Sequence, residues 1–280
     1  MEKVESVQNM RALAARLRGK RGALALVPTM GALHAGHEAL IGAAMAAGGP
    51  VVASIFVNPL SFGLNENFGG YPRSLDADLA LCSRLGVSAA FVPSIEEVYP
   101  RGFSTYVTEE HVSKPLCGIS RPTHFRGVAT LAAKLLNIVG PDRLYLGQKD
   151  AQHVAVLRKM IADLNYHVEV VVVPTVREPD GLAAAVRNSE LTQGQRQDAP
   201  AIDKALKRVK AMVDSGVLSS DRLIAEATHI MGQHRRVRVI YVSVVDPNTM
   251  EPVREVVPGR TLICIAAWLD EVRLTDNAVL

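Results

Sequence analysis

Cysteine, aromatic side chains and long apolar runs are all scarce in this sequence. Three of the 280 residues are cysteines (Cys82, Cys117 and Cys264), and they lie far apart without a Cys-x-x-Cys pair. This spacing argues against a disulfide framework or a zinc knuckle and fits a reducing compartment. No apolar run is long enough to span a membrane, and residues 1–20 lack the apolar core of a signal peptide. We therefore expect a cytoplasmic protein with no membrane partner.

An excess of charge of one sign is also missing. The chain has 31 basic and 28 acidic residues, for a net charge of +3, which is too mild to indicate a nucleic-acid partner. One basic cluster, Arg235, Arg236 and Arg238, is interpreted as a solvated helix end. With 48% hydrophobic and 21% charged residues, the composition is that of an ordinary globular chain, long enough for one large domain or two smaller ones.

Strand and helix patterns alternate through residue 173. Apolar runs predict buried strands at residues 22–27, 51–57, 87–92, 144–146 and 167–173, and we expect Pro28 to end the first of them. The stretches between them predict helices at residues 5–18, 34–47, 75–85, 127–139 and 151–164. This alternation predicts an α/β fold with a Rossmann-like, doubly wound parallel sheet.

The pattern changes after Arg177. Amphipathic helices are predicted at residues 192–214 and 220–234, followed by strands of a small antiparallel sheet at 237–245, 261–266 and 272–274. We therefore expect a Rossmann-like domain at residues 1–177 and a smaller α+β domain at residues 178–280.

Residues 27–40 join the first predicted strand to the helix that follows it. His34 and His37 are three residues apart, so they share a face at the helix start. Gly31 and Gly36 have no side chains, so a ligand can approach the backbone closely at these two positions. A helix start offers unpaired N–H groups and the positive end of the dipole, so this stretch predicts a polyphosphate site. Two alternatives stay open: zinc binding, for which no third ligand stands at a recognisable spacing, and helix-face histidines without a role.

Polar segments follow four of the predicted strands. They are residues 28–37, 58–62, 147–153 and 174–187. Ligands of open parallel sheets bind beyond the carboxyl ends of the strands, so we expect these segments to converge on one edge of the sheet.

The motif His34-x-Gly-His37 after a first strand resembles the HxGH signature of the nucleotidylyltransferase superfamily, whose members attack the α-phosphate of ATP and release pyrophosphate. Longer motifs resemble the pantothenate synthetase (pantoate–β-alanine ligase) family almost from end to end. These motifs are residues 27–37, 54–59 with 62–63, 71–73, 124–130, 147–150, 176–182, 187–188 and 273–277.

The resemblance implies a two-step reaction that uses ATP and Mg²⁺. A carboxylate attacks the α-phosphate to give an acyl adenylate and pyrophosphate, and an amine then displaces AMP to give an amide. The catalytic residues implied are His34, His37, Lys149 and Arg187, which would stabilise charge on the phosphates. Mg²⁺ would be held mainly by phosphate oxygens and weakly by Asp150, which has an equally good role as a helix cap. A C-terminal lid domain and a homodimer are also implied.

The resemblance further assigns binding residues for both substrates of the first step. Those for ATP are Pro28, Met30, Gly36, His37, Asn58, Gly147, Lys149, Asp150, Val176, Ala184, Ala185, Val186 and Arg187. Those for the acid are Met30, Ser61, Gln152 and His153.

The chain departs from the family at the acid-binding residues. Ser61 and His153 stand where the family has two glutamines that hydrogen-bond pantoate, and Ala185 and Val186 replace two serines. A site built to bond a substrate hydroxyl can discriminate by roughly 10⁴–10⁵-fold, so both losses together would weaken pantoate recognition unless Ser61 and His153 rebuild it. Three hypotheses follow: a ligase for pantoate or a close relative, a paralogue for another acid or amine in a specialised pathway, and a nucleotide-binding protein without ligase activity.

Overall fold

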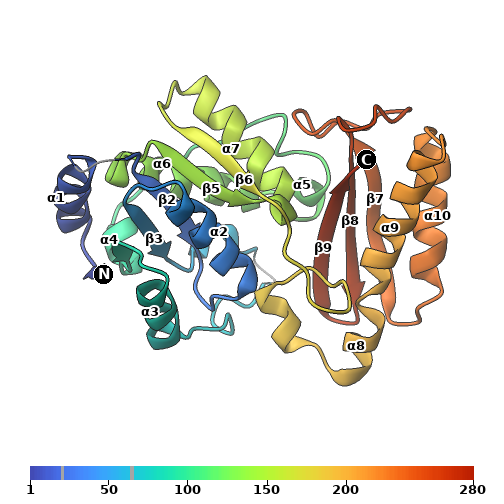
Figure 1. Cartoon of the computed structure of the whole chain (residues 1–280), viewed down its shortest axis with the longest axis horizontal. Coiled ribbons are helices and arrows are strands. Elements are labelled where there is room, and N and C mark those ends of the chain that lie inside the picture. Colours follow the sequence, from blue (N-terminus) through green and yellow to red (C-terminus); the bar gives the residue numbers. More distant parts are fainter. Residues whose placement is uncertain (20–21, 64–65) are drawn as a thin grey trace. The chain divides into compact units, whose positions relative to one another are not determined.

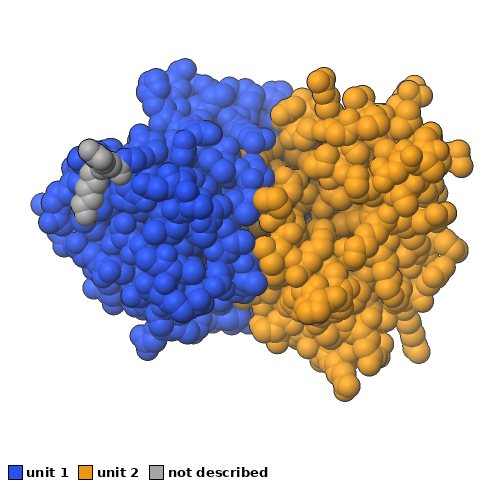
Figure 2. Space-filling model, in the orientation of Figure 1, with its two compact units in different colours: residues 1–147, 156–173 blue, residues 148–155, 174–280 orange. Residues whose placement is uncertain are grey.

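The computed structural model describes residues 1–19, 22–63 and 66–280. They group into two compact units, coloured separately in Figure 2. Unit 1 comprises residues 1–147 and 156–173, and unit 2 comprises residues 148–155 and 174–280. The expected domain boundary between residues 177 and 178 stays a prediction.

Unit 1 is built on a six-stranded, wholly parallel sheet (Figure 1). In spatial order its strands are β1 (Glu2–Val4), β4 (Ala89–Phe91), β3 (Val51–Ile55), β2 (Ala25–Thr29), β5 (Arg143–Gly147) and β6 (Glu169–Val173). The predicted doubly wound class is confirmed. Only β1 was not expected, because three residues show no periodicity and this strand exists through its pairing with β4.

Helices follow the strands of the parallel sheet in the predicted alternation, and residues 148–155 among them belong to unit 2. They are α1 (Val7–Arg18), α2 (Ala35–Ala46), α3 (Leu75–Arg84), α4 (Ile95–Val98), α5 (Cys117–Ser120), α6 (His124–Val139) and α7 (Ala151–Asp163), with single 3₁₀ turns η1 (Pro59–Ser61) and η2 (Gln148–Asp150). Ile41 and Ala44 of α2 and Cys82 of α3 form one apolar cluster with Val27 and Ala53. Strand β3 is buried throughout, and β2 is buried except at Pro28, which is half-buried, as their apolar runs predict.

Pro28 does not end its strand, contrary to our expectation. β2 continues to Thr29, and Pro28 lies opposite Ser54 of β3. The ladder between β2 and β5 stops at Leu26, so the N–H that proline lacks is not needed on that side of the strand.

Unit 2 is an α+β unit with a three-stranded antiparallel sheet. Its strands, in spatial order, are β7 (Val237–Val245), β8 (Leu262–Leu269) and β9 (Val272–Val279). Its helices are α8 (Gln193–Asp198), α9 (Ala201–Asp214) and α10 (Ser220–Gly232), with the 3₁₀ segment η3 (Val186–Glu190). One helix was predicted over 192–214, but Pro200 separates it into α8 and α9. Apolar residues of α9 and α10 form one core with those of the sheet.

The four polar segments follow neighbouring strands of the parallel sheet. Residues 28–37 follow β2, 58–62 follow β3, 147–153 follow β5 and 174–187 follow β6. Because parallel strands end on the same side, all four segments leave the same edge. Among the described residues, no helix is both long and apolar enough to cross a bilayer.

Candidate functional site

The two histidines of the opening motif form the cap of helix α2. The His34 ring atom Nδ1 accepts from the Gly36 N–H at 3.1 Å, and the His37 Nδ1 accepts from the His34 N–H at 3.3 Å. This reciprocal pattern is a capping box made with imidazoles instead of a hydroxyl and a carboxylate. The two ring centroids lie 4.2 Å apart, so the cap holds both rings together.

The cap also fixes where each ring carries its proton. A nitrogen that accepts a hydrogen bond has no proton, so in the neutral form both rings are protonated at Nε2. Each ring is partly exposed, and that N–H is a hydrogen-bond donor. The sequence suggested free backbone amides at this helix start, but those of Gly36, His37 and Glu38 are bonded to His34. The donors suited to a phosphate here are therefore the ring nitrogens.

The turn before His34 has its own set of acceptors. The Gly31 N–H bonds Thr29 Oγ1 at 3.3 Å, and the N–H groups of Ala32 and Leu33 bond the two carboxylate oxygens of Asp78 at 2.9 and 2.8 Å. Gly31 and Ala32 both have positive φ, +80° and +49°, which is strained for alanine. Side chains outside the turn therefore hold its backbone in place.

The side chain of Asn58, which follows strand β3, forms hydrogen bonds with other residues of the protein. Its Nδ2 donates to Ser61 Oγ at 2.8 Å and to the Gly127 carbonyl at 2.9 Å, and its Oδ1 accepts from the Leu60 N–H and the Tyr99 hydroxyl. A side chain at Gly127 would meet the Leu60 carbonyl at 2.2 Å, so glycine lets α6 lie against η1. This buried asparagine thus fixes the position of Ser61.

The backbone of Ser61 is held as firmly as its side chain. Its carbonyl accepts from His124 Nδ1 at 2.8 Å and from Arg121 Nη2 at 3.1 Å. Arg121 also pairs with Glu66 through two oxygens at 2.6 and 2.7 Å and donates to His124 Nε2. Since Nε2 accepts from a guanidinium and Nδ1 faces a carbonyl, His124 is the neutral Nδ1–H tautomer. Among the described residues, Ser61 has no acceptor for its own hydroxyl proton.

In unit 2, the segment that carries Lys149 is tied to the last strand. The side-chain amide of Asn277 donates to the carbonyls of Gln148 and Lys149 at 2.9 and 2.8 Å, and Gln148 Nε2 donates back at 2.8 Å. The Lys149 ammonium is 3.5 Å from Asp150 Oδ1. Strand β9 therefore sets the backbone of η2.

Asp276, beside Asn277, anchors a buried ionic network. Arg177 donates to its two oxygens at 2.6 and 3.3 Å and lies 3.3 Å from Asp203. Burial raises the pKa of Asp276, and the hydrogen bond and charge of Arg177 oppose that effect. Gly181 has φ +96°, and a side chain there would overlap Asp203. The network fixes the start of the segment that leads to Arg187.

Residues 176–187 fold back on themselves beside this network. The Ala184 N–H bonds the Val176 carbonyl at 2.9 Å, and Ala185 precedes η3, which carries Val186 and Arg187. Arg187 is partly exposed and has no hydrogen bond or ion pair with any part of the chain that the structure describes. A guanidinium in this state is available to an anionic ligand.

The remaining predicted residues divide between the units. Met30 and Gly36 lie in the unit 1 turn and helix start, and Gly147 ends β5. Gln152 is buried and His153 partly exposed in the first turn of α7, in unit 2. The described residues contain no group of three or more histidine, cysteine or acidic side chains placed to hold a metal. Asp150, the carboxylate suggested by the sequence for Mg²⁺, is the last residue of η2.

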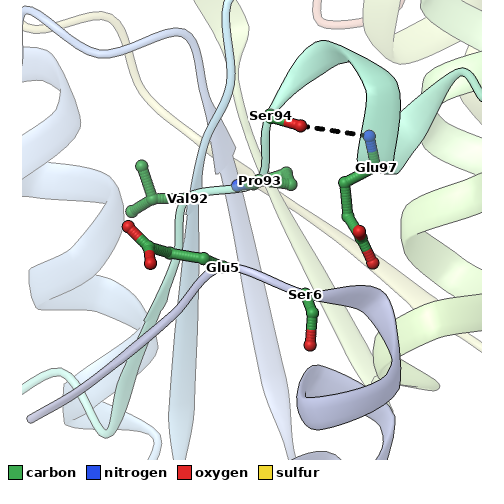
Figure 3. Close-up of a pocket in the computed structure, with 6 residues that line it drawn as sticks. All are labelled: Glu5, Ser6, Val92, Pro93, Ser94 and Glu97. Carbon is green, nitrogen blue, oxygen red and sulfur yellow. Dashed lines mark hydrogen bonds between the residues drawn. The ribbon is translucent and has the colours of Figure 1, made fainter.

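A hollow in unit 1 lies at the far end of the sheet edge, beyond β1 and β4 (Figure 3). It is lined by Glu5, Ser6, Val92, Pro93, Ser94 and Glu97. Its polar groups serve the helices: Ser94 Oγ accepts from the Glu97 N–H, Glu97 Oε1 from the Val7 N–H, and Ser6 Oγ from the Asn9 N–H. Glu5 pairs with Lys3 at 2.7 Å.

Sequence reasoning did not assign roles to Asp78, Arg121, His124 and Asn277. Asp78 lies in the first turn of the predicted helix 75–85, where an acidic side chain needs no further explanation, and the others lie within or beside recognised motifs. Each acts through a contact with residues far along the chain, which no local pattern reveals.

The sequence matches the pantoate-beta-alanine ligase family over residues 2–279. It is 47% identical to a pantothenate synthetase of Acidobacterium capsulatum, over 100% of this chain and 97% of that protein. The structure is similar to pantothenate synthetase from Thermus thermophilus, with TM-score 0.94 and 40% identity, covering 100% and 99% of the two chains. A Francisella tularensis pantoate-beta-alanine ligase complexed with beta-gamma ATP and beta-alanine has TM-score 0.82 and 30% identity, covering 100% and 97%. This chain belongs to the pantoate–β-alanine ligase family.

Proposed function

We propose that this chain is an ATP-dependent, AMP-forming ligase that joins pantoate, or a closely related small acid, to β-alanine or a similar amine. In the first step a carboxylate oxygen bonds the α-phosphorus of ATP, the bond to the β-phosphate breaks, and pyrophosphate leaves. In the second step the amine nitrogen bonds the acyl carbon, AMP leaves, and the nitrogen loses a proton. Family membership and the imidazole capping box support this proposal.

The capping box is the observation that carries it. His34 and His37 present Nε2–H donors from a fixed cap, so they lose little freedom when a phosphate binds. Donors arranged in advance where charge develops stabilise a transition state without reorganisation. Lys149 and Arg187 of unit 2 would add two positive charges to the nucleotide. Mg²⁺, bound mainly to the phosphates and to Asp150, would neutralise further charge.

A second candidate is a member of the family that uses another acid. Ser61 favours it, because its hydroxyl is held by Asn58 and can donate one hydrogen bond from a fixed position. His153 would supply a second group whose protonation can change near neutral pH. The third hypothesis, a nucleotide-binding protein without ligase activity, has less support, since the capping box is intact and Arg187 is available to an anion.

The test is acid-dependent exchange of labelled pyrophosphate into ATP, with Mg²⁺ and a panel of small acids. Exchange with pantoate supports the first candidate, and exchange with another acid but not pantoate supports the second. ATP binding without exchange for any acid would leave only the third. The double substitution Ser61→Gln with His153→Gln should raise pantoate exchange if the acid site has changed; the two single variants serve as controls.

We further propose a homodimer, as the family resemblance implies, and a cytoplasmic location, which the scattered cysteines favour. Sedimentation of the purified chain tests the first, with a monomer at micromolar concentration as the contrary result. Cell fractionation tests the second.

A further inference from the structure

The turn that delivers His34 is held by a buried carboxylate that comes from another helix. Asp78 lies in the first turn of α3 and is 2% exposed. Its Oδ2 accepts from the Ala32 N–H and its Oδ1 from the Leu33 N–H, while the Ser74 hydroxyl also donates to Oδ1 at 3.1 Å. All three donors are thus directed at one side chain.

The shape of the turn requires such a partner. Gly31 and Ala32 take left-handed backbone conformations in succession, and for alanine this costs roughly 1 kcal/mol or more. Strained residues persist only where surrounding contacts over-determine them. A Cβ at Gly31 would come within 3.0 Å of Asp78 Oδ2, so the turn fits closely against the carboxylate.

The consequence of the turn is the position of the histidines. Leu33 is followed directly by His34, the N-cap, whose own N–H bonds the His37 ring. From Gly31 to His34, every backbone N–H has a side-chain acceptor. The chain of bonds runs from Asp78 through the turn to both imidazoles, so a shift at Ala32 and Leu33 changes where the Nε2–H groups point.

Asp78 itself faces protein rather than a ligand. Besides the turn, its neighbours include Cys82, one helical turn further along α3, whose thiol pKa is raised to about 11 by burial and by the charge of Asp78. Its carboxylate oxygens are occupied by protein donors. It is suited to hold the turn, not to touch a phosphate.

We infer that Asp78 is a positioning residue for adenylyl transfer, because it fixes the turn at residues 31–33 and thereby the two imidazole donors. This inference rests on the proposed function for its kinetic consequence. The geometric part, that Asp78 sets the histidine rings, is independent of turnover.

The substitution Asp78→Asn tests it. Asparagine has almost the same shape, but it has one acceptor oxygen and an NH₂ group, so one of the two backbone N–H groups would face another donor. We expect kcat for pyrophosphate exchange to fall about 100-fold, as a displacement of about 1 Å permits, with a smaller change in KM for ATP. The ¹⁵N shifts of the His34 and His37 rings should change as well.

Asp76→Asn is the matched control. Asp76 is exposed, lies in the same first turn and carries the same charge near the same helix end, so this variant reproduces the electrostatic loss without the contact. It should keep wild-type kcat and ring shifts. If folded Asp78→Asn also keeps them, or if its kcat corrected for folded fraction equals that of Asp76→Asn, the inference is overturned.

Ser74→Ala covers the case in which Asp78→Asn does not fold. It removes one donor to Asp78 Oδ1 from an exposed residue and should lower kcat about fivefold, the effect of one neutral hydrogen bond. Wild-type kcat and ring shifts in Ser74→Ala would then overturn the inference. If the wild-type chain shows no exchange with any acid, the proposed function fails, and the ring shifts alone decide the role of Asp78.

Discussion

The side chain of Asn277, three residues from the end of the sequence, donates a hydrogen bond of 2.8 Å to the backbone carbonyl of Lys149. The two residues are 128 positions apart, yet both belong to unit 2. Together with the bonds between Asn277 and Gln148, this contact holds η2 against β9. Strand β9 therefore fixes the backbone position from which the side chain of Lys149 extends.

Replacing Asn277 with alanine should displace the backbone of Lys149 while leaving the lysine side chain itself unchanged. Three hydrogen bonds of a residue that is 4% exposed are lost, and buried groups left unpaired cost about 1–3 kcal/mol each. We expect a lower urea midpoint and pyrophosphate exchange reduced about tenfold, since small misplacements of a catalytic group are costly.

A double-mutant cycle separates the two effects. If Asn277 acts on catalysis through Lys149, then Asn277→Ala in a Lys149→Ala background should lower exchange no further. The exposed Asn248, replaced by alanine, is the control for loss of an asparagine in unit 2. Additive losses in the cycle would contradict a role through Lys149.

The histidine cap allows structure and chemistry to be separated at His34. Asparagine is among the best N-cap residues, so His34→Asn should keep the cap of α2 while removing the Nε2–H donor. We expect an unchanged midpoint and a kcat lower by about 10²–10³-fold, the usual cost of one electrostatic donor. His34→Ala should lose the same activity and about 1 kcal/mol of stability in addition.

The same reasoning applies at His37, the third residue of helix α2. Glutamine is a natural partner at this position of a capping box, so His37→Gln should fold like the wild type and lose exchange activity. Circular dichroism melts and exchange kinetics measured on the same samples test both substitutions. Full activity in His37→Gln would show that its ring nitrogen is not a phosphate donor.

The sequence was sufficient for the parts of the site that depend on local pattern. An apolar run followed by a histidine pair predicted the strand and the start of α2, because hydrophobic periodicity acts over a few residues. The imidazole cap was not predicted: the sequence suggested unpaired backbone N–H groups at this helix start, and His34 bonds them. Asp78 and Asn277 could not be predicted in the same way. Asp78 had a sufficient local explanation as a first-turn acid, and its contact with the turn exists only once α3 packs beside β2.

Pro28 and Pro200 show that local sequence pattern also failed to predict two features of the fold. Proline ordinarily stops a strand, but whether its missing N–H matters depends on which neighbour the strand pairs with at that point. At Pro28 the β5 ladder has already ended. Amphipathic spacing continued across Pro200, so the periodicity predicted one helix where backbone chemistry makes two.

Glu109 gives unit 1 a pH-dependent contribution to stability. Burial by itself would raise the pKa of Glu109, but the N–H groups of His111, Val112 and Ser113, which donate to its carboxylate, together lower it below its usual value. A depressed folded-state pKa means that the stability is complete above the unfolded-state pKa and is lost as pH falls through the folded one. Glu109→Gln should therefore cost about 1–3 kcal/mol at pH 7.

The difference between Glu109→Gln and the wild type should shrink in acid, where the wild-type carboxylate is also protonated. Urea midpoints measured from neutral pH to below the usual glutamate pKa test this. Glu110→Gln is the control, because that side chain is exposed and pairs with exposed Lys114. A stability difference that stays constant with pH would refute the role of the charge.

Arg177 should show the opposite pH dependence when it is removed. In Arg177→Met the buried carboxylates of Asp276 and Asp203 lose a shared cation, and breaking a buried pair costs about 3–5 kcal/mol. Burial raises the pKa of Asp276 and Arg177 is the main opposing influence, so without Arg177 the pKa rises further above the unfolded value. A carboxyl group with a raised pKa destabilises the fold when ionised, so the variant should gain stability as pH falls from neutral, relative to the wild type. Arg208→Met removes an exposed arginine from its pair with half-buried Glu226, and it should cost less than about 1 kcal/mol at any pH. Equal losses in the two variants would mean that the Asp276 network adds no more than a surface ion pair.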